Sequence, residues 1–176
     1  MPNNISRAID RSLLRSYIAN RRIGSGNTAV AGSHEIMKVK RTEDGFLVVL
    51  DAGDEILASL KEIAANERIA LASFTGIGAV RDAILGYLDI DQKEYLKQQF
   101  GPESLELLSM IGNIARMNDE PVIHCHVVLG DREMRTFGGH LFQARVSVTV
   151  EIFMRVFEGE VSREFDPRFG ANLLKL

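Results

Sequence analysis

The chain has no tryptophan, four prolines and a single cysteine among its 176 residues. One cysteine excludes both an intrachain disulfide and a zinc site built from cysteine pairs. It also fits a reducing compartment, and we expect a cytoplasmic protein with no membrane contact. The apolar runs are far shorter than the roughly 20 residues that a membrane-spanning helix needs. Hydrophobic residues make up 45% of the sequence, which is enough for one globular domain with its own core.

Only the N-terminus carries a net positive charge. Residues 1–34 hold five arginines and one acid, a net charge of +4, whereas residues 35–176 hold 16 basic and 23 acidic side chains, a net charge of −7. A body with that charge repels the phosphate backbone of nucleic acid. Any contact with DNA would therefore depend on the N-terminal arm.

The N-terminal arm, residues 1–36, can be drawn as a helix with a stripe of Arg7, Arg11 and Arg15, followed by a flexible Gly/Ser-rich linker. Three interpretations are open: a transit-type address, a basic arm for a nucleic acid or partner, and extra sequence upstream of the true start. The third is favoured because the sequence from Met37 onward already resembles the beginning of a domain. His34, in the linker, receives no role.

The body of the chain, residues 37–165, is predicted to be one domain, followed by a C-terminal tail over residues 166–176. We expect one helix over residues 54–67 and a polar connection near residues 93–102. Strands are expected over residues 38–42, 46–53, 69–80, 81–90, 104–117, 120–130 and 141–157, the last of them bent or bulged. One or two helices packed on a mainly antiparallel β-sheet make an α+β fold.

One stretch, HCHVVLGDREMRTFGGH from His124 to His140, holds three of the four histidines and the only cysteine. Side chains alternate along a strand, so His124 and His126 share a face, with Cys125 buried on the other. A hairpin centred on Glu133 places His126 opposite His140, since both lie seven residues away. Three neutral imidazoles are a familiar ligand set for zinc and leave a fourth position open. The spacing therefore predicts a metal site.

Other features of this stretch have simpler interpretations. Gly138 and Gly139 would allow a bulge that re-aims the ring of His140. Asp131 and Glu133 are expected to be solvated charges of the turn. The spacing loosely follows the first cupin motif, but Asp131 replaces the usual glutamate, Asn118 stands where a glycine is expected, and no second motif follows.

The run from Glu106 to Met154 resembles the signature of the plants and prokaryotes conserved (PPC) domain. It contains ELLSMIG, then HCH, GGHL and TVE, and the earlier segments FLVVLDAGDEI and SFTGIGAVRDAILGYLD also match. The resemblance covers about residues 37–160. It implies an α+β fold, a homotrimer and, as in some members of the family, a metal ion at the shared histidines, which are His124, His126 and His140 here.

The same resemblance leaves some features unmatched. Glu151 occupies the TVE position and falls on the opposite face from His140, so its role is open. Plant relatives carry AT-hooks with an Arg-Gly-Arg-Pro core, which is absent here. They also use a Gly-Arg-Phe-Glu-Ile-Leu segment to contact transcription factors, and this chain has residues 103–108, ESLELL, in its place.

Three hypotheses about function follow. The first is a homotrimeric protein that binds zinc, or another divalent transition metal, through His124, His126 and His140. No catalytic residue is assigned, because no general base or nucleophile motif is evident. The second is a DNA-binding regulatory protein that lacks the AT-hook. The third is a structural or sensory module whose histidines bind a small ligand instead of a metal.

Overall fold

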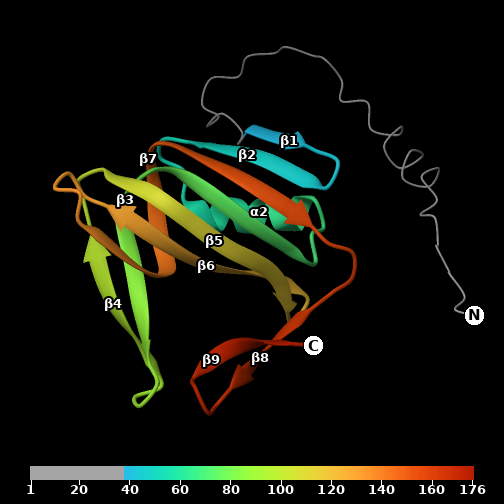
Figure 1. The fold of residues 1–176 in the computed structure, drawn as a ribbon. Helices are drawn as coiled ribbons and strands as arrows, with labels where there is room; N and C mark the ends of the chain where they lie inside the picture. Colours follow the sequence, from blue (N-terminus) through green and yellow to red (C-terminus); the bar gives the residue numbers. More distant parts are fainter. Residues whose placement is uncertain (1–37) are drawn as a thin grey trace, which may run out of the picture. The chain divides into compact units, whose positions relative to one another are not determined.

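The computed structural model describes residues 38–176, and Figure 1 shows how their strands and helix are arranged. The N-terminal arm, residues 1–36, lies outside the described residues, so its three interpretations stay open and His34 is not placed. In the part of the chain that is described, no helix is both long and apolar enough to cross a membrane.

Nine strands and one helix make up the described residues, which confirms the predicted α+β class and its mainly antiparallel sheet. In chain order the elements are β1 Lys38–Arg41, β2 Gly45–Asp51, α2 Ile56–Asn66, β3 Ala72–Asp89, β4 Glu94–Phe100, β5 Leu105–Met117, β6 Glu120–Gly130, β7 Thr136–Val156, β8 Ser162–Asp166 and β9 Ala171–Lys175. Only the short contact between β5 and β8 is parallel.

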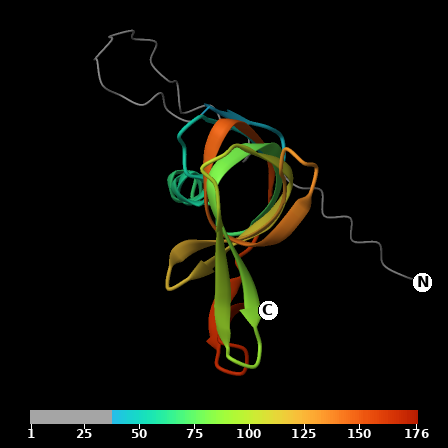
Figure 2. The same cartoon turned by 90° about the vertical axis from the view of Figure 1, so that its left-hand side faces the viewer.

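The four long strands close on one another into a ring, and Figure 2 looks along it. β3 pairs with β5 on one side and with β7 on the other, β5 pairs with β6, and β6 pairs with the start of β7. β7 has 21 residues, so its first part reaches β6 while its later part lies between β2 and β3. Many of the largest buried side chains, among them Phe74, Met110 and Ile152, come from these strands, and others from β2 and α2 complete the core.

The helix α2 lies beside this ring and packs against β6 and β7 (Figure 2). Its buried side chains Ile56, Leu60 and Ile63 recur at the spacing of one helical face. The side chain of Glu55 caps the helix by accepting a hydrogen bond from the Ala58 amide at 2.7 Å. The acids that precede Ile56 therefore end the loop, and the helix begins two residues later than the sequence suggests.

The prediction of two strands, over residues 69–80 and 81–90, is wrong. β3 runs without a break from Ala72 to Asp89, and its pairing with β5 shifts register between Gly76 and Gly78. The glycines that suggested a bend instead make a bulge, which lets one long strand curve around the ring.

Three strands were not expected from the sequence. β4 occupies the segment assigned to a polar connection and pairs with the outer half of β3. β8 and β9 form a hairpin near the C-terminus, held to β5 at a single position, Arg116 with Ser162. The ribbon of β3 and β4 and the hairpin of β8 and β9 extend beyond the ring on the same side (Figures 1 and 2).

Candidate functional site

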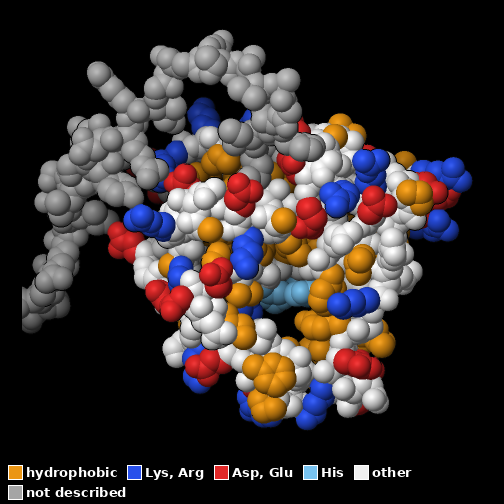
Figure 3. Space-filling model, turned by 180° about the vertical axis from the view of Figure 1, so that it is seen from behind, with side chains coloured by type: hydrophobic (Ala, Val, Ile, Leu, Met, Phe, Trp, Pro, Cys, Tyr) orange, Lys and Arg blue, Asp and Glu red, His pale blue; other side chains and the backbone are white. Residues whose placement is uncertain are grey.

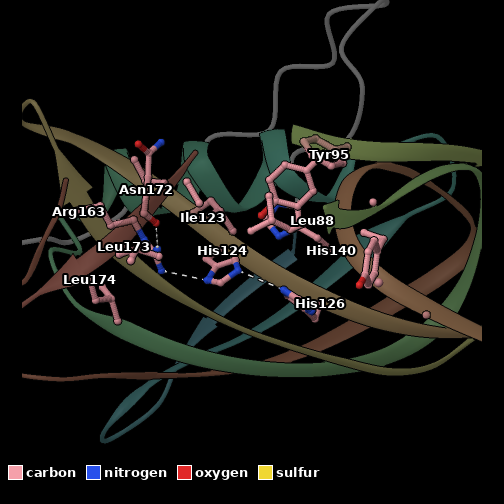
Figure 4. A pocket seen from close by; sticks show the side chains of 17 residues that line it. Leu88, Tyr95, Ile123, His124, His126, His140, Arg163, Asn172, Leu173 and Leu174 are labelled. Carbon is pink, nitrogen blue, oxygen red and sulfur yellow. Dashed lines mark hydrogen bonds between the residues drawn. The ribbon is translucent and has the colours of Figure 1, made fainter. Parts of the chain in front are cut away.

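Three histidines converge where β6 meets the start of β7. His126 pairs directly with His140 across the two strands, as the hairpin centred on Glu133 predicted. His124 lies two residues back on β6 and shares their face. The three ring centroids are 5.1 to 5.2 Å apart, and Figure 4 shows the rings lying close together. Strand alternation and register thus bring together all three residues named from the sequence.

The bulge expected at Gly138 and Gly139 is absent, because the pairing of β6 with β7 runs in unbroken register from His126 to Gly130. A close approach of backbones accounts for a glycine here. A Cβ atom on Gly139 would lie 2.8 Å from the carbonyl oxygen of Gly86 on β3. His140 therefore keeps ordinary strand geometry, and its ring is aimed by pleating alone.

His124 is held by a buried arginine from the C-terminal hairpin. Nη2 of Arg163 donates to Oδ1 of Asn113 at 2.7 Å and lies 3.1 Å from Nδ1 of His124. Because a guanidinium can only donate, Nδ1 of His124 accepts, and the proton of the neutral ring sits on Nε2. That atom is 3.2 Å from Nε2 of His126. Burial, then the charge of Arg163, then His126 lower the pKa of His124 to about 4.

His140 lies among aromatic rings. Its centroid is 5.0 Å from that of Tyr95 and 4.9 Å from that of Phe142. Nδ1 of His140 is buried without a hydrogen-bond partner among the described residues. Burial is the main cause that lowers the pKa of His140 to about 4, with smaller contributions from the other two histidines. At neutral pH, His124 and His140 are therefore uncharged, which is the form that coordinates metals.

The cluster fits a metal ion in most respects. One ligand atom from each histidine can be chosen so that all lie within 4.8 Å of one another. A tetrahedral zinc with nitrogen ligands at about 2.0–2.1 Å requires ligands about 3.3 Å apart, and the two Nε2 atoms of His124 and His126 are 3.2 Å apart. Nδ1 of His140 has no partner, so this ring lacks the hydrogen bond that usually orients a metal-bound histidine. Coordination through Nε2 of His124 would require its proton to leave that atom and Arg163 to release Nδ1.

Cys125, Asp131 and Glu151 do not belong to the histidine cluster. Cys125 faces the core, as predicted, and burial raises the pKa of its thiol to about 12. Asp131 does more than carry a solvated charge, because its Oδ1 accepts from the amides of Glu133 and Arg135 and orders the hairpin turn. The hydrogen bond from the Arg135 side chain lowers the pKa of Asp131. Glu151 is exposed on β7 opposite Ile77, away from the histidines.

The histidines form the floor of a cavity of about 750 Å³. Figure 3 shows it as a hollow with the histidines at its base and apolar side chains around it. One wall comes from the β3–β4 ribbon and β7, and the other from β6 and the β8–β9 hairpin (Figure 4). The side chains and backbone that border it belong to Gly86, Tyr87, Leu88, Tyr95, Val122, Ile123, His124, His126, Gly138, Gly139, His140, Phe142, Arg163, Ala171, Asn172, Leu173 and Leu174.

Arg163 and Tyr95, which contact His124 and His140, were not predicted from the sequence. Arg163 lies in β8, 39 residues from His124 along the chain, and its side chain is buried. Tyr95 lies in the segment assigned to a loop. Neither belongs to a motif, so no local signal connected them to the histidine cluster.

Three solved structures resemble this chain closely in both sequence and fold. A metal-containing protein from Archaeoglobus fulgidus is 35% identical with a TM-score of 0.71, over 81% of this chain and all of its own (100%). A PPC protein from Pyrococcus horikoshii is 31% identical with a TM-score of 0.70, over 82% of this chain and 98% of its own. A protein from Ralstonia eutropha JMP134, described as a candidate DNA-binding protein, is 33% identical with a TM-score of 0.73, over 79% and 96%.

No curated protein matches the chain closely enough to count as a relative. The sequence profile of the Plants and Prokaryotes Conserved domain matches residues 37–158, which include all three clustered histidines. With the ring of strands and the three solved relatives, this match means that the chain belongs to the plants and prokaryotes conserved domain family.

Proposed function

We propose that the protein is a homotrimer that binds a divalent transition metal ion, zinc in the first instance, through His124, His126 and His140. The observation that carries the proposal is the convergence of three imidazoles on one strand face, with two Nε2 atoms at a separation that suits one ion. The relative from Archaeoglobus fulgidus, which is described as metal-containing, supports it.

Three protein ligands would leave one position of a four-coordinate ion open to another group. A metal held there would supply Lewis-acid character to whatever occupies the cavity. The cavity wall contains no aspartate or glutamate, so the described chain offers no carboxylate as a general base. The proposal therefore stops at metal binding and assigns no reaction.

The trimeric state is supported by apolar side chains on the outer face of the ring. Ile111 and Phe153 flank Thr75 in one row across β5, β3 and β7, and they are 61% and 63% exposed. Ile77 and Val148, at 57% and 67% exposed, border one shallow hollow nearby. Contiguous apolar patches of this kind mark surfaces that other protein covers.

Light scattering coupled to size-exclusion chromatography tests the oligomeric part. Wild type should have three times the mass of the chain, and Phe153→Lys should shift it toward the monomer. Ile90→Lys, at a residue that is 58% exposed outside this patch, is the matched control and should leave the trimer intact. A monomeric wild type would refute the trimer without affecting the metal site.

Elemental analysis of untagged protein tests the metal site. Wild type should carry about one zinc, or another transition metal, per chain, and His126→Ala should lose it. His126 is exposed, so this substitution should leave the fold intact. His34→Ala is the matched control, because it removes the one histidine outside the cluster. Wild-type protein that carries no metal and fails to take up added zinc near pH 7 would refute the proposal.

The alternative is a DNA-binding protein without an AT-hook. It is favoured by the solved relative from Ralstonia eutropha and by another from Bacteroides thetaiotaomicron, both described as candidate DNA-binding proteins. The charge of −7 over residues 35–176 opposes it, whereas residues 1–34 carry +4. Deleting residues 1–34 should abolish salt-sensitive binding to a DNA duplex and leave the metal content unchanged. DNA binding that survives the deletion would implicate the body of the protein instead.

A further inference from the structure

The cavity above the histidines has a single fully charged side chain in its wall, that of Arg163. Within residues 38–176, no aspartate, glutamate or lysine borders it, and apart from the three histidines and the amide of Asn172 the rest of the wall is apolar, aromatic or backbone. Arg163 is only 6% exposed. A charged group is costly to bury unless an opposite charge compensates it, so the absence of an acid beside this guanidinium is unusual.

The hydrogen bonds of Arg163 leave its charge uncompensated. Within residues 38–176 its partners are the carbonyl oxygen of Asn172, Oδ1 of Asn113 and Nδ1 of His124, all of them neutral. Its Nε is buried without any partner. A guanidinium has five N–H donors, and these contacts use three of them. The side chain is therefore held in place by neutral groups while its positive charge stays available.

The remaining wall of the cavity determines what else a ligand must carry. Leu88 and Tyr95 contribute from the β3–β4 ribbon, Ile123 from β6, and Leu173 and Leu174 from the C-terminal hairpin. Figure 4 shows these side chains on both sides of the histidines and Arg163. The volume of about 750 Å³ lies within the range of about 300–1,000 Å³ typical of small-molecule sites.

We propose that this cavity binds a small organic carboxylate with an apolar body. Its carboxylate lies against Arg163 and the histidines, and its aliphatic or aromatic part lies between the two hairpins. The three contacts leave two donors on Arg163, its buried Nε–H and one N–H of Nη1, and a carboxylate can accept a charge-assisted hydrogen bond from a single such group. The inference rests on the proposed function because the metal, when bound, would face the same carboxylate. The two can nevertheless fail separately, since the charge of Arg163 does not depend on the metal.

Isothermal titration calorimetry of the full chain with 3-phenylpropionate tests the proposal. The neutral isostere 3-phenylpropionamide controls for the apolar body, and inorganic phosphate controls for the charge. The carboxylate should bind at least about tenfold more tightly than the amide, as expected for a charge-assisted hydrogen bond in a buried site. Equal affinity of carboxylate and amide, or phosphate binding as tight as the carboxylate, would overturn the proposal.

Two kinds of variant locate the site. Arg163→Met should remove the preference for the carboxylate over the amide. Because that change also removes three hydrogen bonds, Leu173→Glu provides a second test that leaves them intact, by placing a negative charge in the cavity wall. Leu173→Glu should lower the affinity for the carboxylate about fivefold and the affinity for the amide far less. Val39→Glu, at a site on β1 that is 40% exposed against 39% for Leu173, should change neither. An unchanged affinity in Leu173→Glu would overturn the proposal even if Arg163→Met fails to fold.

The same titrations on chelator-treated and zinc-loaded protein separate this proposal from the proposed function. A carboxylate preference that persists in protein unable to hold zinc would support the ligand site and refute the metal site. Stoichiometric zinc without any carboxylate preference would support the metal site and refute the ligand site.

Discussion

Lowering the pH of the metal-free protein from about 7 to about 5 should reduce its free energy of unfolding. The folded-state pKa of His124 and that of His140 are both lowered to about 4, mainly by burial, from an ordinary value of 6.5. Between these values the unfolded chain binds protons that the folded protein does not. Stability therefore rises with pH through this window, is fully present above pH 6.5, and is lost as the pH falls toward 4.

The size of the effect follows from the two pKa values. The gap between 6.5 and about 4 corresponds to at most about 3 kcal/mol per histidine. Both histidines are only partly buried, so we reduce this to about 1–2 kcal/mol each near pH 5. Together the two histidines should lower the stability of the metal-free protein by about 2–4 kcal/mol.

Urea unfolding near pH 7 and near pH 5 measures this loss in chelator-treated protein. The reference is the double variant His124→Gln, His140→Gln, which retains polar side chains but cannot titrate there. Both proteins must be compared at one concentration, because oligomerisation would make stability concentration-dependent. The wild type should lose about 2–4 kcal/mol more than the variant. Equal losses in the two proteins would refute the argument that these histidines are buried in their neutral form.

Three further predictions concern the buried core and the helix cap. Cys125, whose thiol pKa is raised to about 12 by burial, should react with a thiol reagent such as Ellman's reagent only after denaturation, and rapid reaction of the folded protein would contradict its placement. Gly112→Ala should destabilise the protein by several kcal/mol in urea unfolding, roughly as an overpacked core does, because its Cβ would collide with the ring of Phe74 and with the backbone carbonyl oxygen of His124. A neutral effect would show that both the ring and the neighbouring strand can shift. Glu55→Ala should cost about 1 kcal/mol through loss of the cap on Ala58, measured by thermal unfolding, and an unchanged melting temperature would show that the cap contributes nothing.

The sequence predicted the histidine cluster because the interactions that form it are local. His124, His126 and His140 lie on two consecutive strands joined by a short turn, so side-chain alternation and turn length fix which residues meet. Whether those histidines hold a metal is a separate question and stays a prediction. The bulge that Gly138 and Gly139 would allow does not form. A glycine pattern alone does not distinguish a bulge from a close approach of neighbouring backbones.

The walls of the site could not be predicted in the same way. β4, β8 and β9 are short strands whose residues are mostly exposed, and such strands lack the alternation of apolar and polar residues that marks a half-buried strand. Arg163 meets His124 only because the C-terminal hairpin folds back against β5 and β6. A contact between residues 39 positions apart depends on the whole topology, and no spacing within a motif encodes it.

The floor and the walls of the cavity are therefore attached to the fold in different ways. His126 and His140 alternate along their strands with the buried residues Cys125, Val127 and Leu141. The core that stabilises these strands therefore also orients the imidazole groups of the histidines. The β8–β9 hairpin, in contrast, is paired to the ring at one position, and the hydrogen bonds of Arg163 form a further link. Because Arg163 is also the only full charge in the cavity wall, an anion bound there would act directly on one of the few attachments of this wall. Ligand binding should for that reason change the position of the β8–β9 hairpin, or the protection of its backbone amides against hydrogen exchange. The histidines at the floor of the cavity should stay in place.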